Sequence, residues 1–247
     1  MNISALPRHD IEEFLYDRRL NRYRWRSQSG AGQLASKASV FNRTRTYINE
    51  QKTELRTIGQ RLIDGQINLT EFQRSAGQTL KNIHLSQAML GRDGLENMAA
   101  NDWLRVGREL QRQYYRGLDR ENNRRYGLAH LSREIADGKV SDRQLLNRLS
   151  MYAESGKVSF SEAFKAANEG KWVIRRLGAT DRHCAFCLAQ AAEGPRKIED
   201  VPAPGCCPQC MSRCLCSLVI VDPPRRSRNP EEIFGRRRSG GGLRVTR

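Results

Sequence analysis

The first 183 residues of this 247-residue chain contain no cysteine, which excludes a disulfide framework from most of the protein. No apolar run approaches the roughly 18 residues that span a membrane, so no transmembrane helix is predicted. The N-terminus, MNISALPRHDIEEFLYDRR, lacks the apolar core of a secretory signal. We therefore expect a cytosolic protein without membrane contacts, whose thiols are kept reduced.

Sequence motifs of catalysis are also lacking. There is no Ser-His-Asp pattern, no glycine-rich phosphate loop and no pair of carboxylates at an informative spacing. His84 and His130 lie within predicted helices, where a lone histidine is more often structural than catalytic. The chain is therefore predicted to be a binding or structural protein, not an enzyme, and to have no small-molecule substrate.

Acidic residues are few relative to basic ones. The 43 Lys and Arg residues outnumber the 27 Asp and Glu residues, which gives a formal net charge of +16. Only eight of the basic residues are lysine, and arginine binds phosphates and carboxylates through a planar fork of donors. This charge predicts attraction to nucleic acid or to acidic protein surfaces.

The N-terminal region, residues 1–39, is predicted to be a basic arm followed by a linker. Its segment RRLNRYRWR interleaves Tyr23 and Trp25 with arginines, a pattern that suits either a nucleic-acid backbone with stacked bases or docking on a neighbouring protein. The glycine- and serine-rich residues 27–39 resemble a flexible link. The candidate binding residues of this arm are Arg18, Arg19, Arg22, Arg24 and Arg26.

Residues 40–171 show a helical pattern of apolar residues. One predicted helix places Phe72, Ala76, Leu80 and Ile83 on a single face, and a later one does the same with Trp103, Val106, Leu110 and Tyr114. No fixed period is present, which favours a helical bundle over a repeat array.

Capping signals divide this region into helices. Expected starts are Thr70 with Gln73, Asn101 or Asp102, Ser141 with Gln144, and Ser159 with Glu162, whereas Gly138, Gly156 and Gly170 are expected to end helices.

Two short β-branched runs, WVIRRLG from residue 172 and SLVIV at 217–221, are predicted to be strands that bracket the cysteines within a zinc-ribbon-like β module at residues 172–222. Residues 223–247 are basic, contain Pro and Gly, and are predicted to be disordered alone. This tail is expected to contact a protein or DNA, or else to serve only solubility. Its candidate binding residues are Arg225, Arg226, Arg236, Arg237 and Arg238.

All seven cysteines lie between residues 184 and 216. Cys184 and Cys187 form one C-x-x-C pair, Cys207 and Cys210 form another, and 19 residues separate the pairs. Two such pairs supply the four soft ligands that tetrahedral zinc needs, at a spacing typical of a zinc ribbon. Disulfides are the first alternative, although the odd count disfavours complete pairing. Redox catalysis is the second, although the βαβ context of a thioredoxin-like site is missing.

The spacing leaves the ligand set open. A second arrangement joins Cys184 and Cys187 to Cys210 with either Cys214 or Cys216, and Cys206 belongs to neither set. His183 adjoins the first pair. The candidate metal ligands are therefore Cys184, Cys187, Cys207, Cys210, Cys214 and Cys216, and the predicted cofactor is structural zinc.

The order of these residues resembles a family signature. Trp172, His183, Cys184 and Cys187 are followed by Pro204-Gly205 and by Cys210, Cys214 and Cys216. This order is similar to the C-terminal signature of tailed-phage minor head, or head-morphogenesis, proteins of the class grouped around phage Mu protein F. Leu215 stands where that pattern has an arginine, and Cys206 and Cys207 are additional.

The resemblance implies a virion protein of the phage head, made in the host cytoplasm, that binds the portal protein, the major capsid protein or packaged DNA. The alternative is a zinc-ribbon nucleic-acid-binding regulator. The predicted fold is mainly α: an elongated helical bundle with a small C-terminal zinc-stapled β module and extended basic arms at both ends.

Overall fold

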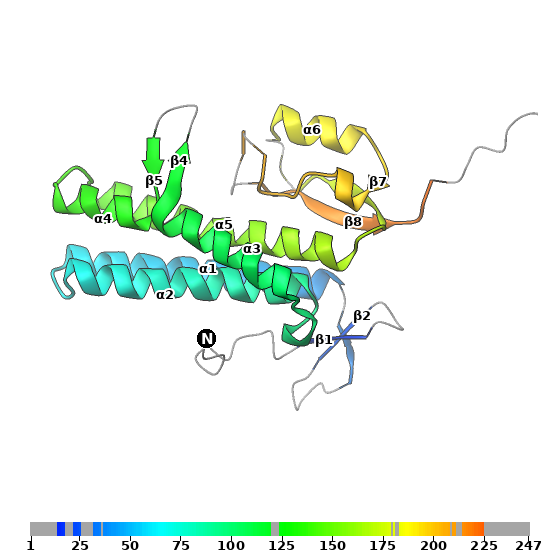
Figure 1. The fold of residues 1–247 in the computed structure, drawn as a ribbon, viewed down its shortest axis with the longest axis horizontal. Coiled ribbons are helices and arrows are strands. Elements are labelled where there is room, and N and C mark those ends of the chain that lie inside the picture. Colours follow the sequence, from blue (N-terminus) through cyan, green and yellow to red (C-terminus); the bar gives the residue numbers. More distant parts are fainter. Residues whose placement is uncertain are drawn as a thin grey trace, which may run out of the picture.

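The computed structural model describes residues 14–17, 22–25, 32–35, 37–119, 124–178, 180, 183–207, 209–210 and 214–224. Figure 1 shows a mainly helical molecule with small antiparallel sheets at its periphery. The mainly α prediction is therefore confirmed. Within these ranges, no helix has the length and apolar character required to cross a membrane.

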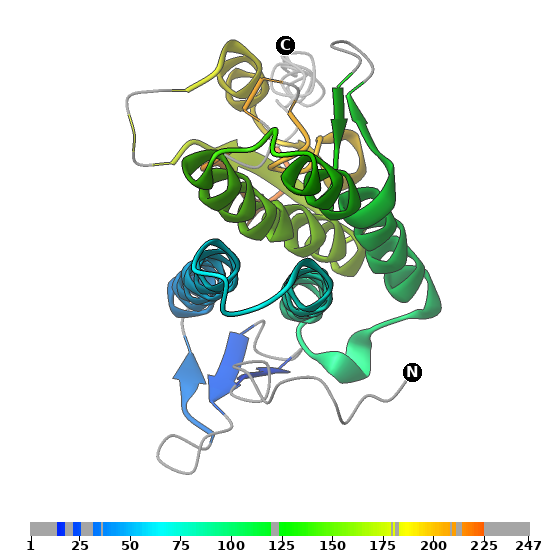
Figure 2. The ribbon, with the colours of Figure 1, turned by 90° about the vertical axis from the view of Figure 1, so that its left-hand side faces the viewer.

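Three long helices form the body of the fold. They are α1 (Lys37–Ile63), α2 (Leu69–Gly91) and α5 (Asp142–Ala167), and they run along the long axis of the molecule (Figure 1). Viewed from one end, α1 and α2 lie side by side with α5 above them (Figure 2). The shorter helices α3 (Ala100–Gln111) and α4 (Leu128–Ala136) complete the bundle, and a 3-10 turn, η3 (Leu95–Asn97), precedes α3.

Apolar side chains from four helices share one core. The predicted face of α2, which includes Phe72, Leu80 and Ile83, is buried and packs against α1, α4 and α5. A second, smaller core joins α2, α3 and α5 through Leu85, Val106 and Ala163. The predicted apolar face, with its 3.6-residue period, is thus confirmed, and its burial stabilises the bundle.

Glycines allow α2 and α5 to approach closely at two points. A Cβ built on Gly156 of α5 would lie 2.4 Å from Ile83 Cγ2 of α2, and one on Gly91 would lie 2.4 Å from the Phe160 carbonyl oxygen. The prediction that Gly156 ends a helix is therefore wrong, and so is the prediction of a new start at Ser159. Gly156 lies inside α5 because tertiary contact with α2 offsets its low helix propensity.

The other capping predictions have mixed outcomes. Ser141 caps α5 with Gln144 as predicted, and Gly138, with φ of 67°, follows the end of α4. The predicted Thr70 cap is wrong, because Asn68 accepts from the Glu71 amide and Glu71 accepts from the Asn68 amide in return. The cap predicted at Asn101 or Asp102 is also wrong, because α3 begins at Ala100 and its N-cap residue is Ala99. Asp102, in the first turn of the helix, accepts a hydrogen bond from the Ala99 amide.

The helix that was predicted to carry Trp103 and Tyr114 on one face is shorter than expected, since α3 ends at Gln111. A π-helical turn, η4 (Arg112–Arg116), leads into strand β4 (Gly117–Asp119), which pairs with β5 (Arg124–Tyr126). The apolar spacing of the sequence did not predict this hairpin. Tyr114 packs against the main core, so its apolar position also fits a continued helix.

The N-terminal arm contains strands in its described parts. β1 (Phe14–Asp17) pairs with β2 (Arg22–Trp25), and β2 pairs with β3 (Leu34–Ala35), all antiparallel. The described segments of the predicted arm therefore form a small sheet, and the extended arm stays a prediction. The predicted linker is also too long, since α1 begins at Lys37. Aromatic residues favour strands, and the interleaved aromatic and basic residues of β2 form a strand here.

The cysteine-rich module, residues 172–222, contains both predicted strands. β6 (Trp172–Arg176) is the central strand, flanked by β7 (Arg196–Lys197) and β8 (Ser217–Val221). A helix, α6 (Ala185–Ala192), and a 3-10 turn, η5 (Ile198–Asp200), complete the module. Val173, Ile198 and Val201 form its small core, against which Phe164 of α5 packs. This contact fixes the module to the end of α5.

His84 lies at the crossing of α2 and α5 and is fully buried. Its Nδ1 is 2.8 Å from Ser159 Oγ, and its Nε2 is 3.4 Å from Ser155 Oγ. Burial lowers the pKa of His84 to about 4, although the carboxylate of Glu109 acts in the opposite direction. The imidazole is therefore neutral at pH 7 and forms part of the core, in agreement with the structural role predicted for it.

The close approach at Gly156 generates a first prediction. Gly156→Ala should lower the free energy of unfolding by about 1–3 kcal/mol, because the added methyl overlaps Ile83. Gly107→Ala is the matched control: Gly107 is an exposed interior residue of α3 where an added Cβ would meet nothing within 4 Å, and the change should stabilise by about 0.5–1 kcal/mol. Urea unfolding followed by circular dichroism measures both, and equal effects of the two changes would refute the packing argument.

The depressed pKa of His84 generates a second prediction. Unfolded His84 binds a proton near pH 6.5, whereas folded His84 does so only near pH 4. The stability that His84 contributes is therefore complete above pH 6.5 and is lost as the pH falls towards 4, by up to about 3 kcal/mol. Unfolding measured between pH 7 and pH 4 should be less pH-dependent in His84→Gln. The wild type and the variant have the same cysteines, so the titration of thiols affects both equally. Parallel plots of unfolding free energy against pH would therefore contradict the lowered pKa of His84.

Candidate metal centre

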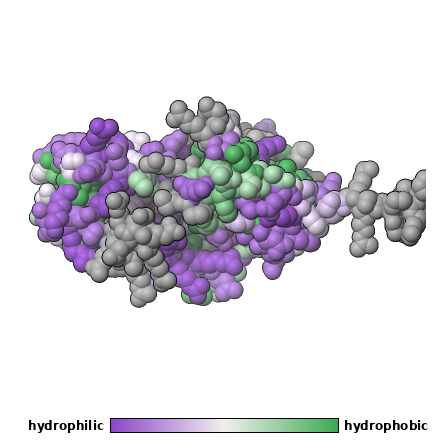
Figure 3. Space-filling view, turned by 90° about the horizontal axis from the view of Figure 1, so that it is seen from above, coloured by the Kyte–Doolittle hydropathy of each residue, from purple (hydrophilic) through white to green (hydrophobic). Residues whose placement is uncertain are grey.

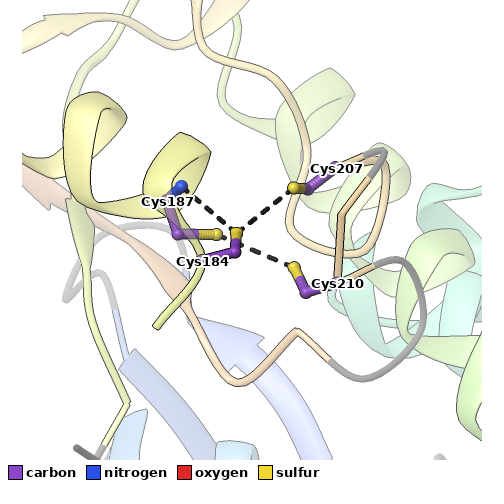
Figure 4. Close-up of side chains that lie close together, drawn as sticks. All are labelled: Cys184, Cys187, Cys207 and Cys210. Atoms are coloured by element: carbon purple, nitrogen blue, oxygen red, sulfur yellow. Dashed lines mark hydrogen bonds between the residues drawn. The ribbon is translucent and has the colours of Figure 1, made fainter. Parts of the chain in front are cut away.

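The first cysteine pair is held by the start of α6. Cys184 is the N-cap residue of this helix, and its Sγ accepts a hydrogen bond from the Cys187 amide at 3.4 Å. The helix geometry therefore turns both sulfurs towards the same point, as Figure 4 shows. A zinc ribbon would carry this pair on a β-hairpin, and in this respect the module differs from the predicted ribbon.

The second pair reaches the first from a turn. Pro204 and Gly205 occupy the middle of a tight turn in which the Cys206 amide donates to the Ala203 carbonyl at 3.1 Å. Gly205 has φ of 95°, a conformation that this turn position requires and that glycine adopts without strain. The turn brings Cys207 Sγ to 3.4 Å from Cys184 Sγ, and Cys210 Sγ to 3.8 Å from Cys187 Sγ (Figure 4).

The last two cysteines approach from the start of β8. Cys214 Sγ lies 3.8 Å from Cys187 Sγ, and Cys187, Cys214 and Cys216 form a group whose sulfurs all lie within 4.8 Å of one another. A first group, defined in the same way, contains Cys184, Cys187, Cys207 and Cys210. We call these six residues the thiol cluster. All six predicted metal ligands are therefore brought together, and Cys187 belongs to both groups.

A buried arginine faces the thiol cluster. The alternation of β6 places Val173 in the core of the module and directs Arg175 towards the cysteines, where it is only 4% exposed. Its Nη1 is 4.0 Å from Cys187 Sγ, and its Nη2 donates to the Pro202 carbonyl, whereas its Nε has no hydrogen-bond partner among the residues that the structure describes. Among the described residues, no carboxylate lies within 4.0 Å of this guanidinium. In the part of the chain that the structure describes, the cluster thiolates are thus the anionic groups placed to offset its charge.

The protonation of the cluster is uneven. Burial raises the pKa values of Cys187 and Cys210 well above the ordinary range. Neighbouring thiols raise them further, because a thiolate is costly next to another negatively charged sulfur. For Cys184, burial is outweighed by the Cys187 amide and by nearby thiols, so that its pKa falls to about 7. Without a cation, the cluster cannot ionise fully.

These features fit a metal ion. Four thiolates at about 2.3 Å from a tetrahedral ion lie about 3.8 Å apart, close to the observed sulfur separations of 3.4 and 3.8 Å. A metal cation would also deprotonate its ligands and give Arg175 its counter-charge. All seven cysteines are free, and a disulfide would require sulfurs about 2.05 Å apart. The thiol cluster can therefore hold a metal ion as it stands.

Two predicted neighbours of the site lie outside the cluster. Cys206 is exposed, and its Sγ is 3.9 Å from Glu162 Oε1 of α5. Loss of hydration and then the carboxylates of Glu162 and Glu109 raise the pKa of Cys206 to about 11. His183 is partly buried but joins neither group of described sulfurs. Sequence reasoning missed Arg175, whose only signal was a charged residue at an inward position of a predicted strand.

The predicted basic binding residues form no described site. Arg22 lies in β2 opposite Asp17, and the Arg24 guanidinium donates to the Gly32 carbonyl at 2.9 Å within the N-terminal sheet. The remaining candidates lie outside the described residues: Arg18, Arg19, Arg26, Arg225, Arg226, Arg236, Arg237 and Arg238.

Comparison with known proteins gives no assignment. No family model matches the chain, and the searches found no matching curated protein and no matching solved structure.

The geometry of the cluster generates a third prediction. Cys187→Ser should abolish metal binding and increase hydrogen exchange in β6 and β8, because a structural metal supplies folding free energy locally. The helices should keep their protection, since their core lies elsewhere. Cys206→Ser is the matched control and should retain full metal content. Elemental analysis and hydrogen-exchange mass spectrometry measure both, and equal metal loss from the two variants would contradict the ligand assignment.

Proposed function

We propose that this chain is a structural protein of a tailed-phage head, a minor head protein that binds the portal protein, the major capsid protein or packaged DNA. It acts by binding and not by catalysis. It is made in the host cytoplasm and retained in the virion, and its module is held together by structural zinc. Zinc is preferred among metals because the ligand set consists of soft thiolates at tetrahedral spacing.

One observation carries the proposal: each residue of the phage-head resemblance except His183 has a part in building the module. Trp172 begins β6, where its ring lies 5.4 Å from Lys197 Nζ. Pro204 and Gly205 form the turn that delivers the second cysteine pair. Cys184, Cys187, Cys210, Cys214 and Cys216 then meet in the thiol cluster. These residues meet in one module, and this common placement is what supports the proposal.

The surface of the module supports protein docking. Figure 3 shows apolar residues gathered on the face that carries the module, between more polar regions. Leu188 on α6 is 48% exposed, and Leu215 before β8 is 49% exposed. Exposed apolar side chains favour a protein partner over a phosphate backbone, which requires cations. The arginine-rich tail is the part of the chain we assign to DNA or to an acidic protein surface.

The proposal is tested in particles. Mass spectrometry of heads purified from the phage or prophage that encodes the chain should detect the protein at few copies per particle. Full-length protein should be compared with a chain truncated after Asp222 for incorporation and for DNA affinity at two salt concentrations. Loss of incorporation on truncation indicates protein docking by the tail, whereas loss of a salt-dependent DNA affinity indicates phosphate contact.

Two results would overturn the proposal. The first is absence of the protein from both heads and assembly intermediates. The second is tight, sequence-preferring DNA binding by the dispersed protein, which is the behaviour of the alternative zinc-ribbon regulator.

A further inference from the structure

The thiol cluster contains more ligands than one metal ion can use. A tetrahedral ion takes four thiolates, and the group of Cys184, Cys187, Cys207 and Cys210 already supplies four. Cys214 and Cys216 remain, and they are 5% and 7% exposed. Both thiols are therefore shielded from solvent, and their sulfurs lie within 4.8 Å of Cys187 Sγ, which belongs to the first group.

Cys187 is the point at which the two groups meet. Its sulfur is 3.8 Å from Cys210 Sγ in the first group and 3.8 Å from Cys214 Sγ in the second. Both separations match the distance between two thiolates on one tetrahedral ion. Cys187 also lies between two elements of the module. It belongs to α6, and Cys214, which precedes β8, contacts its sulfur.

We propose that the module binds two divalent metal ions that share the Cys187 thiolate. The first ion is held by Cys184, Cys187, Cys207 and Cys210, and the second by Cys187, Cys214 and Cys216. Three thiols supply the second ion, so its fourth position is left to a ligand from outside the thiol cluster, such as water. The number of ions and the sharing of Cys187 do not depend on whether the chain is a phage head protein.

The charges of the two-ion arrangement are compatible with its burial. Six thiolates and two divalent cations carry a net charge of −2, the same as four thiolates around one cation. Arg175, 4.0 Å from Cys187 Sγ, offsets part of this charge. One cation with six thiolates would instead carry −4, and among the described residues Arg175 is the only cation in hydrogen-bond contact with a cluster sulfur. A second metal ion therefore keeps the net charge of the six-thiolate cluster equal to that of a single four-thiolate site.

The test is a count of ions on the full-length protein. Protein prepared with zinc under reducing conditions should contain two ions per chain by native mass spectrometry and elemental analysis. After replacement by ¹¹³Cd, two cadmium resonances should appear, and they should be coupled to each other through the shared sulfur. One ion and one resonance in the wild-type protein would overturn the inference while leaving the single metal site intact, whereas no bound metal would overturn both.

Matched variants separate the two ions. Cys216→Ser should lower the count from two to one, with one cadmium resonance and protected β6, because the first ion keeps all four of its ligands. Cys206→Ser should keep two ions, since its thiol lies outside the cluster. A Cys216→Ser protein that still binds two ions, or that loses both, would contradict the proposed division of ligands.

Discussion

The cysteine-rich module depends on the convergence of six thiols around Cys187, with the buried Arg175 beside it. The module's own core of Val173, Ile198 and Val201 is small, so burial of apolar surface contributes little to its stability. A buried guanidinium without a carboxylate partner is costly unless anionic sulfur surrounds it. Thiolates bound to a metal ion would satisfy both needs at once, because they would link α6, the Pro204-Gly205 turn and the start of β8 while balancing the arginine.

The helical body has a different source of stability. Its core is formed by apolar stripes of α1, α2, α4 and α5, and close crossings at Gly91 and Gly156 bring the backbones of α2 and α5 together. Phe164 at the end of α5 then packs against the module. The body is therefore expected to fold on apolar burial alone and to present the module at one end. This division suits a protein whose role is to hold one surface in a fixed position relative to another.

The proposed role in a phage head follows from the module more than from the charge. The net charge of +16 suits many partners, whereas the ordered signature from Trp172 to Cys216 accounts for a specific three-dimensional cluster. Exposed Leu188 and Leu215 give this rigid end an apolar contact surface. The basic segments would add electrostatic attraction, which steers association without defining its geometry.

The sequence by itself determined the helical body, the two strands of the module and the six candidate ligands, because apolar periodicity, β-branched runs and C-x-x-C spacing are local properties. Tertiary structure decided the rest. It placed Gly156 inside α5, where contact with Ile83 overrides propensity, and it inserted a hairpin after α3 that no local pattern indicated. It also arranged the cysteines into two groups that share Cys187, and it aimed Arg175 at them. Spacing along the chain cannot reveal these relations, because they depend on how α6, the turn and β8 meet in space.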